Sequence, residues 1–267
     1  MTVRQWRTRD SLDPLGPPAT WLEAQGREQI GSAADFTVVA VHDGDLVGVG
    51  CAYASRWHPR RLWSYVEVAP DHRRNAHGTA LLQALRRRAE RPLRGKVTAG
   101  SAGAAFARAR SLRSIQRCRT LALATADTPK RPDVDADPSV HVAAAAFRAF
   151  YATTHHWDPL GDIGPDEFVA SHLADAVARF AVRGDDGDVL AIGCLYDEGD
   201  ALLLSGGPTR PGEHAATETL VAAAARFAAR AGRELTAEVD NANESLARAT
   251  QHYAPVVLDE THIVADS

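Results

Sequence analysis

Residues 65–85, YVEVAPDHRRNAHGTALLQAL, decide the fold of this chain. Aromatic and β-branched residues open the stretch and predict a strand, which is broken at Pro70. From His77 onward, apolar residues at helical spacing predict an amphipathic helix. A strand that passes through a short polar loop into a helix presents unpaired backbone N–H groups and the positive end of the helix dipole. The stretch therefore predicts an anion site, most naturally one for a pyrophosphate.

The loop from Arg73 to Gly78 resembles the acyl-CoA-binding signature of the GNAT (GCN5-related N-acetyltransferase) superfamily. That signature is Arg or Gln, two free positions, Gly, one free position, then Gly or Ala, and Ala76 stands here where the family usually has Gly. A Cβ atom at this position narrows the approach of a phosphate and disfavours a positive φ. The alternative without a binding function is an ordinary β-to-α turn with surface arginines. The resemblance implies acetyl-CoA binding by Arg73, Arg74, Asn75, Ala76, His77, Gly78 and Thr79.

The composition is that of a globular protein, with 45% hydrophobic and 24% charged residues in a chain of 267. No apolar run is long enough to span a bilayer, and residues 1–4 open no signal peptide, so we expect a cytoplasmic protein without a membrane partner. The cysteines Cys51, Cys118 and Cys194 sit singly in apolar segments without the spacing of a zinc site. We therefore expect buried structural thiols and no metal site.

Charge is divided unevenly along the chain. Residues 1–131 carry 22 Lys and Arg against 11 Asp and Glu, whereas residues 132–267 carry 8 against 23. This asymmetry predicts two units, the first of which lies near a polyanion. Attraction between the two halves is the other interpretation of the same split.

The first half alternates strands and helices in an order that agrees with the GNAT fold, a mixed sheet flanked by helices. The pattern predicts the order β-α-β-β-β-α-β-α-β. The expected elements are strands at 3–6, 36–42, 46–53, 62–69, 96–99 and 120–125, and helices at 19–29, 77–91 and 102–115.

A linker rich in Pro and Asp at 127–139 separates this half from a second run of similar elements. The repeated order predicts an α/β (α+β) protein of two tandem GNAT-like mixed β-sheets flanked by helices, with domains at 1–131 and 132–267. An unrelated α+β domain is the alternative for the second half. The expected elements there are helices at 140–153, 164–173, 214–231 and 243–251, and strands at 177–183, 189–196, 201–205, 235–239 and 256–264.

The second half lacks the signature loop at the corresponding place. Residues 208–216 contain no Arg-x-x-Gly-x-Gly core and carry Glu213 at the start of the expected helix. An acidic residue there satisfies the helix dipole internally and repels a phosphate. We expect this half to have lost donor binding and to serve as a structural partner and a wall of the acceptor pocket.

The resemblance implies direct attack of an acceptor amine on the bound thioester, which calls for a donor cradle, a base and a group that polarises the thioester carbonyl. Main-chain groups near Val66 and Val68 are implied to pair with the pantetheine arm. Glu67 is the nearest ionisable residue to act as the base. It shares its strand face with Tyr65, and the sequence leaves open whether this face or the opposite one meets the acceptor.

Other side chains are weaker candidates. Many GNAT members place a tyrosine on the fourth helix to protonate the leaving thiolate, but residues 102–115 contain none, and Phe106 and Ser111 are the nearest substitutes. A loop histidine, His58, is a second candidate base. We expect His72 and His77 to flank the phosphate.

Sixteen Lys and Arg lie between Arg56 and Arg119, against three acids, which is more positive charge than coenzyme A needs. Aminoacyl-tRNA is also an activated acyl donor, and its backbone would favour such a surface. The leading interpretation is an acyl-CoA-dependent N-acyltransferase that uses acetyl-CoA on a small-molecule amine, as a monomer or homodimer. An aminoacyl-tRNA-dependent transferase and a non-catalytic GNAT scaffold are the alternatives.

Overall fold

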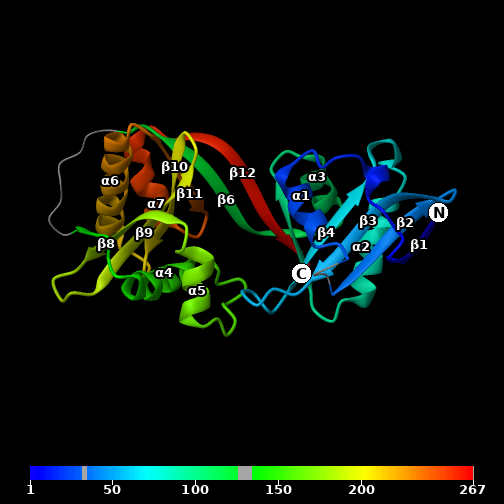
Figure 1. Ribbon diagram of the computed structural model, residues 1–267, viewed down its shortest axis with the longest axis horizontal. Coiled ribbons are helices and arrows are strands. Elements are labelled where there is room, and N and C mark those ends of the chain that lie inside the picture. The colour runs from blue at the N-terminus through cyan, green and yellow to red at the C-terminus, as the bar shows by residue number, and fades with distance from the viewer. Residues whose placement is uncertain (32–34, 126–133, 267) are drawn as a thin grey trace. The chain divides into compact units, whose positions relative to one another are not determined.

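The computed structural model describes residues 1–31, 35–125 and 134–266. The chain divides into two compact units, Met1–Ile115 with His262–Ser267, and Gln116–Thr261 (Figure 1). The domain boundary expected between residues 131 and 132 lies outside the described residues. Along the sequence, the first unit ends at Ile115 and the second begins at Gln116. The first unit also includes His262–Ser267.

The first unit holds a mixed sheet with the strand order β1-β2-β3-β4-β5-β12. Strands β1 to β4 pair antiparallel, whereas β4 and β5 are parallel. Its elements are β1 (Thr2–Gln5), η1 (Asp13–Leu15), α1 (Trp21–Glu28), β2 (Phe36–His42), β3 (Asp45–Tyr53), β4 (Leu62–Val68), η2 (Pro70–His72), α2 (His77–Arg88), β5 (Leu93–Thr98), α3 (Ala102–Ala109) and the end of β12 (Val256–Ala265).

Alternation along the strands gives this sheet two apolar faces. Val38 and Ala40 face the core beneath α2, where Leu81 and Leu85 are fully buried. Val39 and Val49 face the opposite side, where they pack with residues of the segment that carries η1. The sheet is therefore buried on both sides, which explains the near-continuous apolar sequence of β2.

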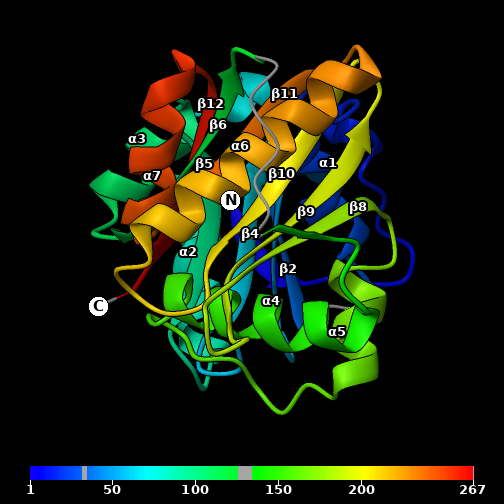
Figure 2. The ribbon, with the colours of Figure 1, turned by 90° about the vertical axis from the view of Figure 1, so that its left-hand side faces the viewer.

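The second unit holds a sheet with the strand order β6-β11-β10-β9-β8-β7, and β12 begins beside β6. Figure 2 shows α6 running along this sheet, and its buried face packs on the strands. The elements are β6 (Arg113–Leu123), β7 (Val134–Ala136), α4 (Val140–Thr154), α5 (Pro165–His172), β8 (Ala176–Arg183), β9 (Val189–Glu198), β10 (Ala201–Pro208), α6 (His214–Ala231), β11 (Glu234–Asp240), α7 (Glu244–Thr250), η3 (Gln251–Tyr253) and β12.

The expected mixed α/β architecture is confirmed, and the bounds of β2 and α6 agree with the expected ranges. The expected helix at 102–115 is wrong beyond Ala109. Ser111 adopts a left-handed conformation with φ of 61°, and Leu112 N–H donates to the carbonyl of Ala107 (3.0 Å), which ends the helix. Residues from Arg113 onward form β6 instead.

The end of β12 has a defined place in the first unit. The Asp266 N–H donates to the carbonyl of Leu93 (2.9 Å), and its carboxylate accepts from Arg86 on α2 (2.5 Å). Nothing in the local sequence pattern of the last strand predicts these contacts, which join residues about 170–180 positions apart.

Candidate functional site

Strands β4 and β5 begin as a parallel pair and then separate. Their register joins Leu62 to Leu93 and Trp63 to Arg94 and goes no further among the described residues. Gly95 still approaches closely, since a Cβ atom there would lie 3.2 Å from the Ser64 carbonyl oxygen. On its other edge β4 stays paired with β3 as far as Val68. The last part of β4 therefore has main-chain groups on its β5 side that no ladder uses.

This opening leads to the start of α2. Two residues of the intervening loop are left-handed, Arg74 with φ of 65° and Ala76 with φ of 62°. Ala76 is the N-cap residue, and its side chain offers no hydrogen bond to the first turn of the helix. The N–H groups of this turn have no acceptor within the helix, so they and the helix dipole form a cradle for an anion.

Gly78 lies where α2 and α3 approach each other. A Cβ atom at Gly78 would stand 3.3 Å from the ring of Phe106 and 3.7 Å from Val68. Of the two residues expected to replace a helical tyrosine, Phe106 lies on α3 and contacts the loop, whereas Ser111 lies in the turn after α3. A larger residue at 78 would displace the phenyl ring or close the cradle.

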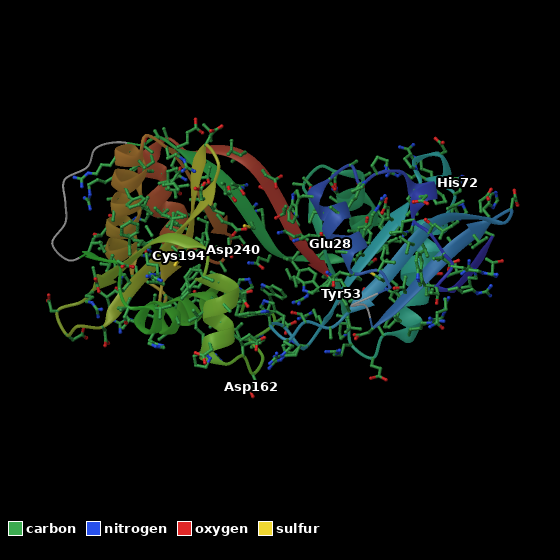
Figure 3. All side chains as sticks on the ribbon, viewed as in Figure 1. Glu28, Tyr53, His72, Asp162, Cys194 and Asp240 are labelled. Atoms are coloured by element: carbon green, nitrogen blue, oxygen red, sulfur yellow. The ribbon has the colours of Figure 1, made fainter. Side chains whose placement is uncertain are left out.

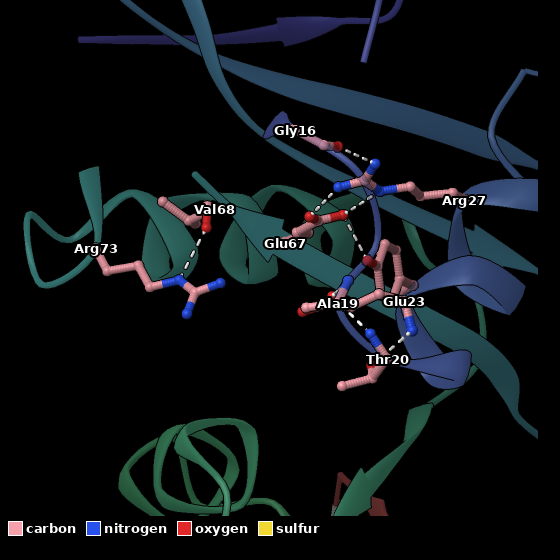
Figure 4. A network of polar contacts seen from close by, with 9 residues as sticks. Gly16, Ala19, Thr20, Glu23, Arg27, Glu67, Val68 and Arg73 are labelled. Carbon is pink, nitrogen blue, oxygen red and sulfur yellow. Dashed lines mark hydrogen bonds and ion pairs between the residues drawn. The ribbon is translucent and has the colours of Figure 1, made fainter. Parts of the chain in front are cut away.

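Arg73 connects the loop to the strand that precedes it. Its Nε donates to the carbonyl oxygen of Val68 (3.1 Å), while its guanidinium group stays exposed (Figure 4). Val66 and Val68 direct their side chains into the core beneath α2. Only main-chain groups of these two residues thus lie at the separating edge of β4, and the Val68 carbonyl there already accepts a bond from Arg73.

Tyr65 and Glu67 lie on the opposite face of β4, toward α1. The Glu67 carboxylate is buried and accepts two bonds from Arg27 of α1, from Nη2 (2.5 Å) and from Nε (2.9 Å). The Tyr65 hydroxyl donates a third bond to it (2.5 Å). Figure 4 shows the bonds between Arg27 and Glu67. Burial, and then the bond to Glu67, raise the pKa of Tyr65 far above its ordinary value.

This network determines what Glu67 can do. The bidentate ion pair with Arg27 fixes the position of the carboxylate. Gly26 of α1 rests on the Tyr65 ring, since a Cβ atom there would come within 2.4 Å of it. Sequence analysis missed Arg27, because a single arginine in a helix 40 residues away carries no local signal of its partner.

The corresponding opening in the second unit is filled by side chains. Strands β10 and β11 pair in parallel from Ala201 to Leu204 and no further among the described residues. The Asn243 side chain donates to the Gly206 carbonyl (3.2 Å), and a Cβ atom at Gly207 would lie 2.6 Å from the Asn243 amide nitrogen. Glu213 is the N-cap residue of α6, where it pairs with an arginine (2.7 Å).

Comparison with known proteins agrees with this geometry. Residues 2–110 match the sequence profile of the acetyltransferase (GNAT) family. No curated protein matches the chain in sequence.

Solved structures share the fold of the whole chain. A GCN5-related N-acetyltransferase from Sphaerobacter thermophilus has a TM-score of 0.62 at 16% identity, over 91% of this chain and 84% of that one. A tandem GNAT protein from the clavulanic acid biosynthesis pathway has a TM-score of 0.54 at 14% identity, over 86% and 82%. Eis1 from Mycobacterium abscessus has a TM-score of 0.52 at 15% identity, over 98% and 73%.

The first unit is therefore a GNAT acetyltransferase domain, and the chain as a whole has the fold of tandem GNAT proteins. Acetyltransferases of this family take the acetyl group from acetyl-CoA and transfer it to an amine.

In the part of the chain that the structure describes, no helix is long and apolar enough to cross a membrane. No group of three or more metal-ligating side chains in that same part is placed to hold a metal ion.

Proposed function

We propose that the first unit binds acetyl-CoA along the separating edge of β4 and at the amino end of α2, and that it acetylates the amine of a small molecule. The observation that carries this proposal is the separation of β4 from β5 directly before a helix whose first N–H groups have no helical acceptor. A main-chain edge followed by a cradle of amides fits a flexible arm that ends in a diphosphate.

The residues of the loop fit such a donor. The left-handed turns at Arg74 and Ala76 bring the backbone of the loop into the first turn of α2, and Gly78 leaves room at the close approach to Phe106. The exposed Arg73 guanidinium adds positive charge beside Val68. Bound there, the donor would supply an activated acetyl thioester. Asn75, His77 and Thr79 complete the proposed cradle.

We propose that the Glu67 carboxylate stabilises the positive charge of the acceptor amine. Arg27 and Tyr65 hold this carboxylate in position. The Tyr65 hydroxyl keeps its proton, because burial and the carboxylate both raise its pKa. It therefore donates to the Glu67 carboxylate and does not act as a base. A proton leaving the acceptor ammonium would go to the Glu67 carboxylate only as the bonds from Arg27 lengthen.

We further propose that the second unit binds no donor. Asn243 and Phe150 stand against Gly207, at the place where β10 and β11 separate. The Glu213 carboxylate at the start of α6 repels a phosphate there. The second unit would then act as a structural partner of the first.

A thermal-shift titration with acetyl-CoA tests the proposed function, because a ligand that binds only the native state raises the unfolding temperature. We expect a shift in the native chain and none in the double variant Arg73→Glu, Gly78→Val. The variant Arg87→Glu reverses a charge on an exposed part of α2 away from the loop and serves as the matched control. An unchanged response in the double variant would show that the donor does not bind this loop.

A second candidate, transfer of an aminoacyl group from tRNA, is favoured by one observation. Arginines of the first unit remain exposed after its ion pairs with Asp266 and Asp35 are taken into account. They are Arg73, Arg74, Arg87, Arg88, Arg108, Arg110 and Arg113. Retention on an RNA column that falls steeply with salt, without any shift by acetyl-CoA, would favour this candidate. No response to either ligand would favour a non-catalytic scaffold.

A further inference from the structure

Three histidine side chains from separate segments gather beside the proposed donor loop. His42 ends β2, His72 ends η2 and His77 is the first residue of α2. Their ring centroids lie 5.6 Å (His42 to His77), 5.9 Å (His42 to His72) and 6.0 Å (His72 to His77) apart. We call these three residues the histidine triad. His72 is labelled in Figure 3.

The surroundings of His77 disfavour positive charge. His77 is only 3% exposed, and its Nδ1 contacts the Met1 sulfur (2.7 Å). Burial, followed by the two neighbouring imidazoles and the terminal ammonium group, lowers the pKa of His77. The Nδ1 of His42 is buried and has no hydrogen-bond partner in the described part of the chain. Its Nε2 lies 3.5 Å from the carboxylate of Asp43, which is itself exposed.

A bound anion would change this balance. His72 directly precedes the loop that runs from Arg73 to Gly78, and His77 lies inside it, whereas His42 lies beside both of these rings from the end of β2. Negative charge at the amino end of α2 stabilises an imidazolium nearby, whereas like charges within the triad destabilise it. The three groups interact with one another, so a proton taken up belongs to the triad rather than to one ring.

We propose that the histidine triad is a proton-linked anion subsite of the donor loop, which takes up a proton when a diphosphate binds at the amino end of α2. This inference rests on the proposed function, because it concerns the same loop. A bound diphosphate favours the protonated form of a neighbouring imidazole, so the complex binds more protons than the free protein. Donor affinity must therefore rise as the pH falls.

Dephospho-CoA is the probe that isolates this effect. It keeps the diphosphate of the donor but lacks the phosphate monoester, whose own second ionisation near pH 6 would obscure the result. Calorimetric titrations at pH 7.5 and 5.5 would give the affinity, and buffers of different ionisation enthalpy would give the number of protons taken up. An average uptake of about half a proton over these two units corresponds to an affinity about tenfold higher at pH 5.5.

The double variant His42→Gln, His72→Gln should lose most of this pH dependence and bind at pH 5.5 about as weakly as at pH 7.5. The control variant His141→Gln removes an exposed histidine of α4 in the other unit and should keep the full dependence. Thermal melts at both pH values would establish that each protein is folded.

Two results would overturn the proposal while leaving the proposed function intact. One is binding of dephospho-CoA with equal affinity and no proton uptake at the two pH values. The other is an unchanged dependence in the double variant. Absence of binding at any pH, to acetyl-CoA as well as to dephospho-CoA, would refute the proposed function and the subsite together.

Discussion

Replacing Ala76 by glycine should stabilise this protein, although glycine usually destabilises the start or interior of a helix. Ala76 has φ of 62° and ψ of 2°, a left-handed conformation that an L-residue with a Cβ atom adopts at a cost of about 1–2 kcal/mol. Glycine carries no such cost there. Its greater freedom in the unfolded chain offsets about 0.4–1 kcal/mol of the gain. We expect a net stabilisation of about 0.5–1 kcal/mol.

The measurement is the unfolding temperature of the Ala76→Gly variant with and without acetyl-CoA. For a chain of this size the unfolding temperature should rise by about 1–4 °C without ligand. The further shift caused by the donor should also grow, because a phosphate meets no Cβ atom at the cradle. Ala80→Gly is the matched control, since Ala80 has ordinary helical geometry in the same helix and its replacement should cost about 0.5–1 kcal/mol.

The outcome that refutes this reasoning is a lower unfolding temperature for Ala76→Gly, comparable to that of the control. It would mean that residue 76 is not left-handed and that the loop does not turn into α2 in the way described. A higher unfolding temperature together with a smaller shift by the donor would keep the backbone conformation and contradict the place assigned to the phosphate.

Two further predictions concern the packing and the electrostatics of the first unit. Gly26→Ala places a Cβ atom within 2.4 Å of the Tyr65 ring and should lower the free energy of unfolding in urea by about 1–3 kcal/mol. Gly103→Ala, whose nearest contact would be at 3.5 Å, is the control and should not lower it. Equal effects of the two substitutions would contradict the packing of α1. The Arg4 guanidinium, through two hydrogen bonds of 2.7 Å, lowers the pKa of Asp10 to about 2. Because this carboxyl is more acidic in the folded state, its contribution of about 1–2 kcal/mol is present above pH 4 and lost as the pH falls toward 2. Acid unfolding of Asp10→Asn should lack that component, and an unchanged acid transition would show that the pair contributes nothing.

Much of the fold was accessible from local sequence. The helical periodicity of α6 and the apolar runs of β2 and β3 are properties of short windows, and the structure confirms these elements. The expected end of α3 was wrong because the residues from Arg110 to Ser111 give no strong stop signal. The left-handed conformation that ends the helix falls on a serine rather than on the glycine that usually marks this position.

The sequence by itself determined that a strand, a polar loop with small residues and an amphipathic helix follow one another, and this order predicted a site for a diphosphate. Only the tertiary structure decided the partners of that loop and of its strand: Arg27 on Glu67, the histidines around His77, and the asparagine that fills the corresponding opening in the second unit. The physical reason is range. Hydrophobic period and turn chemistry act between neighbours along the chain, whereas an ion pair or a filled opening depends on which distant side chains the packed sheet brings within a few ångströms.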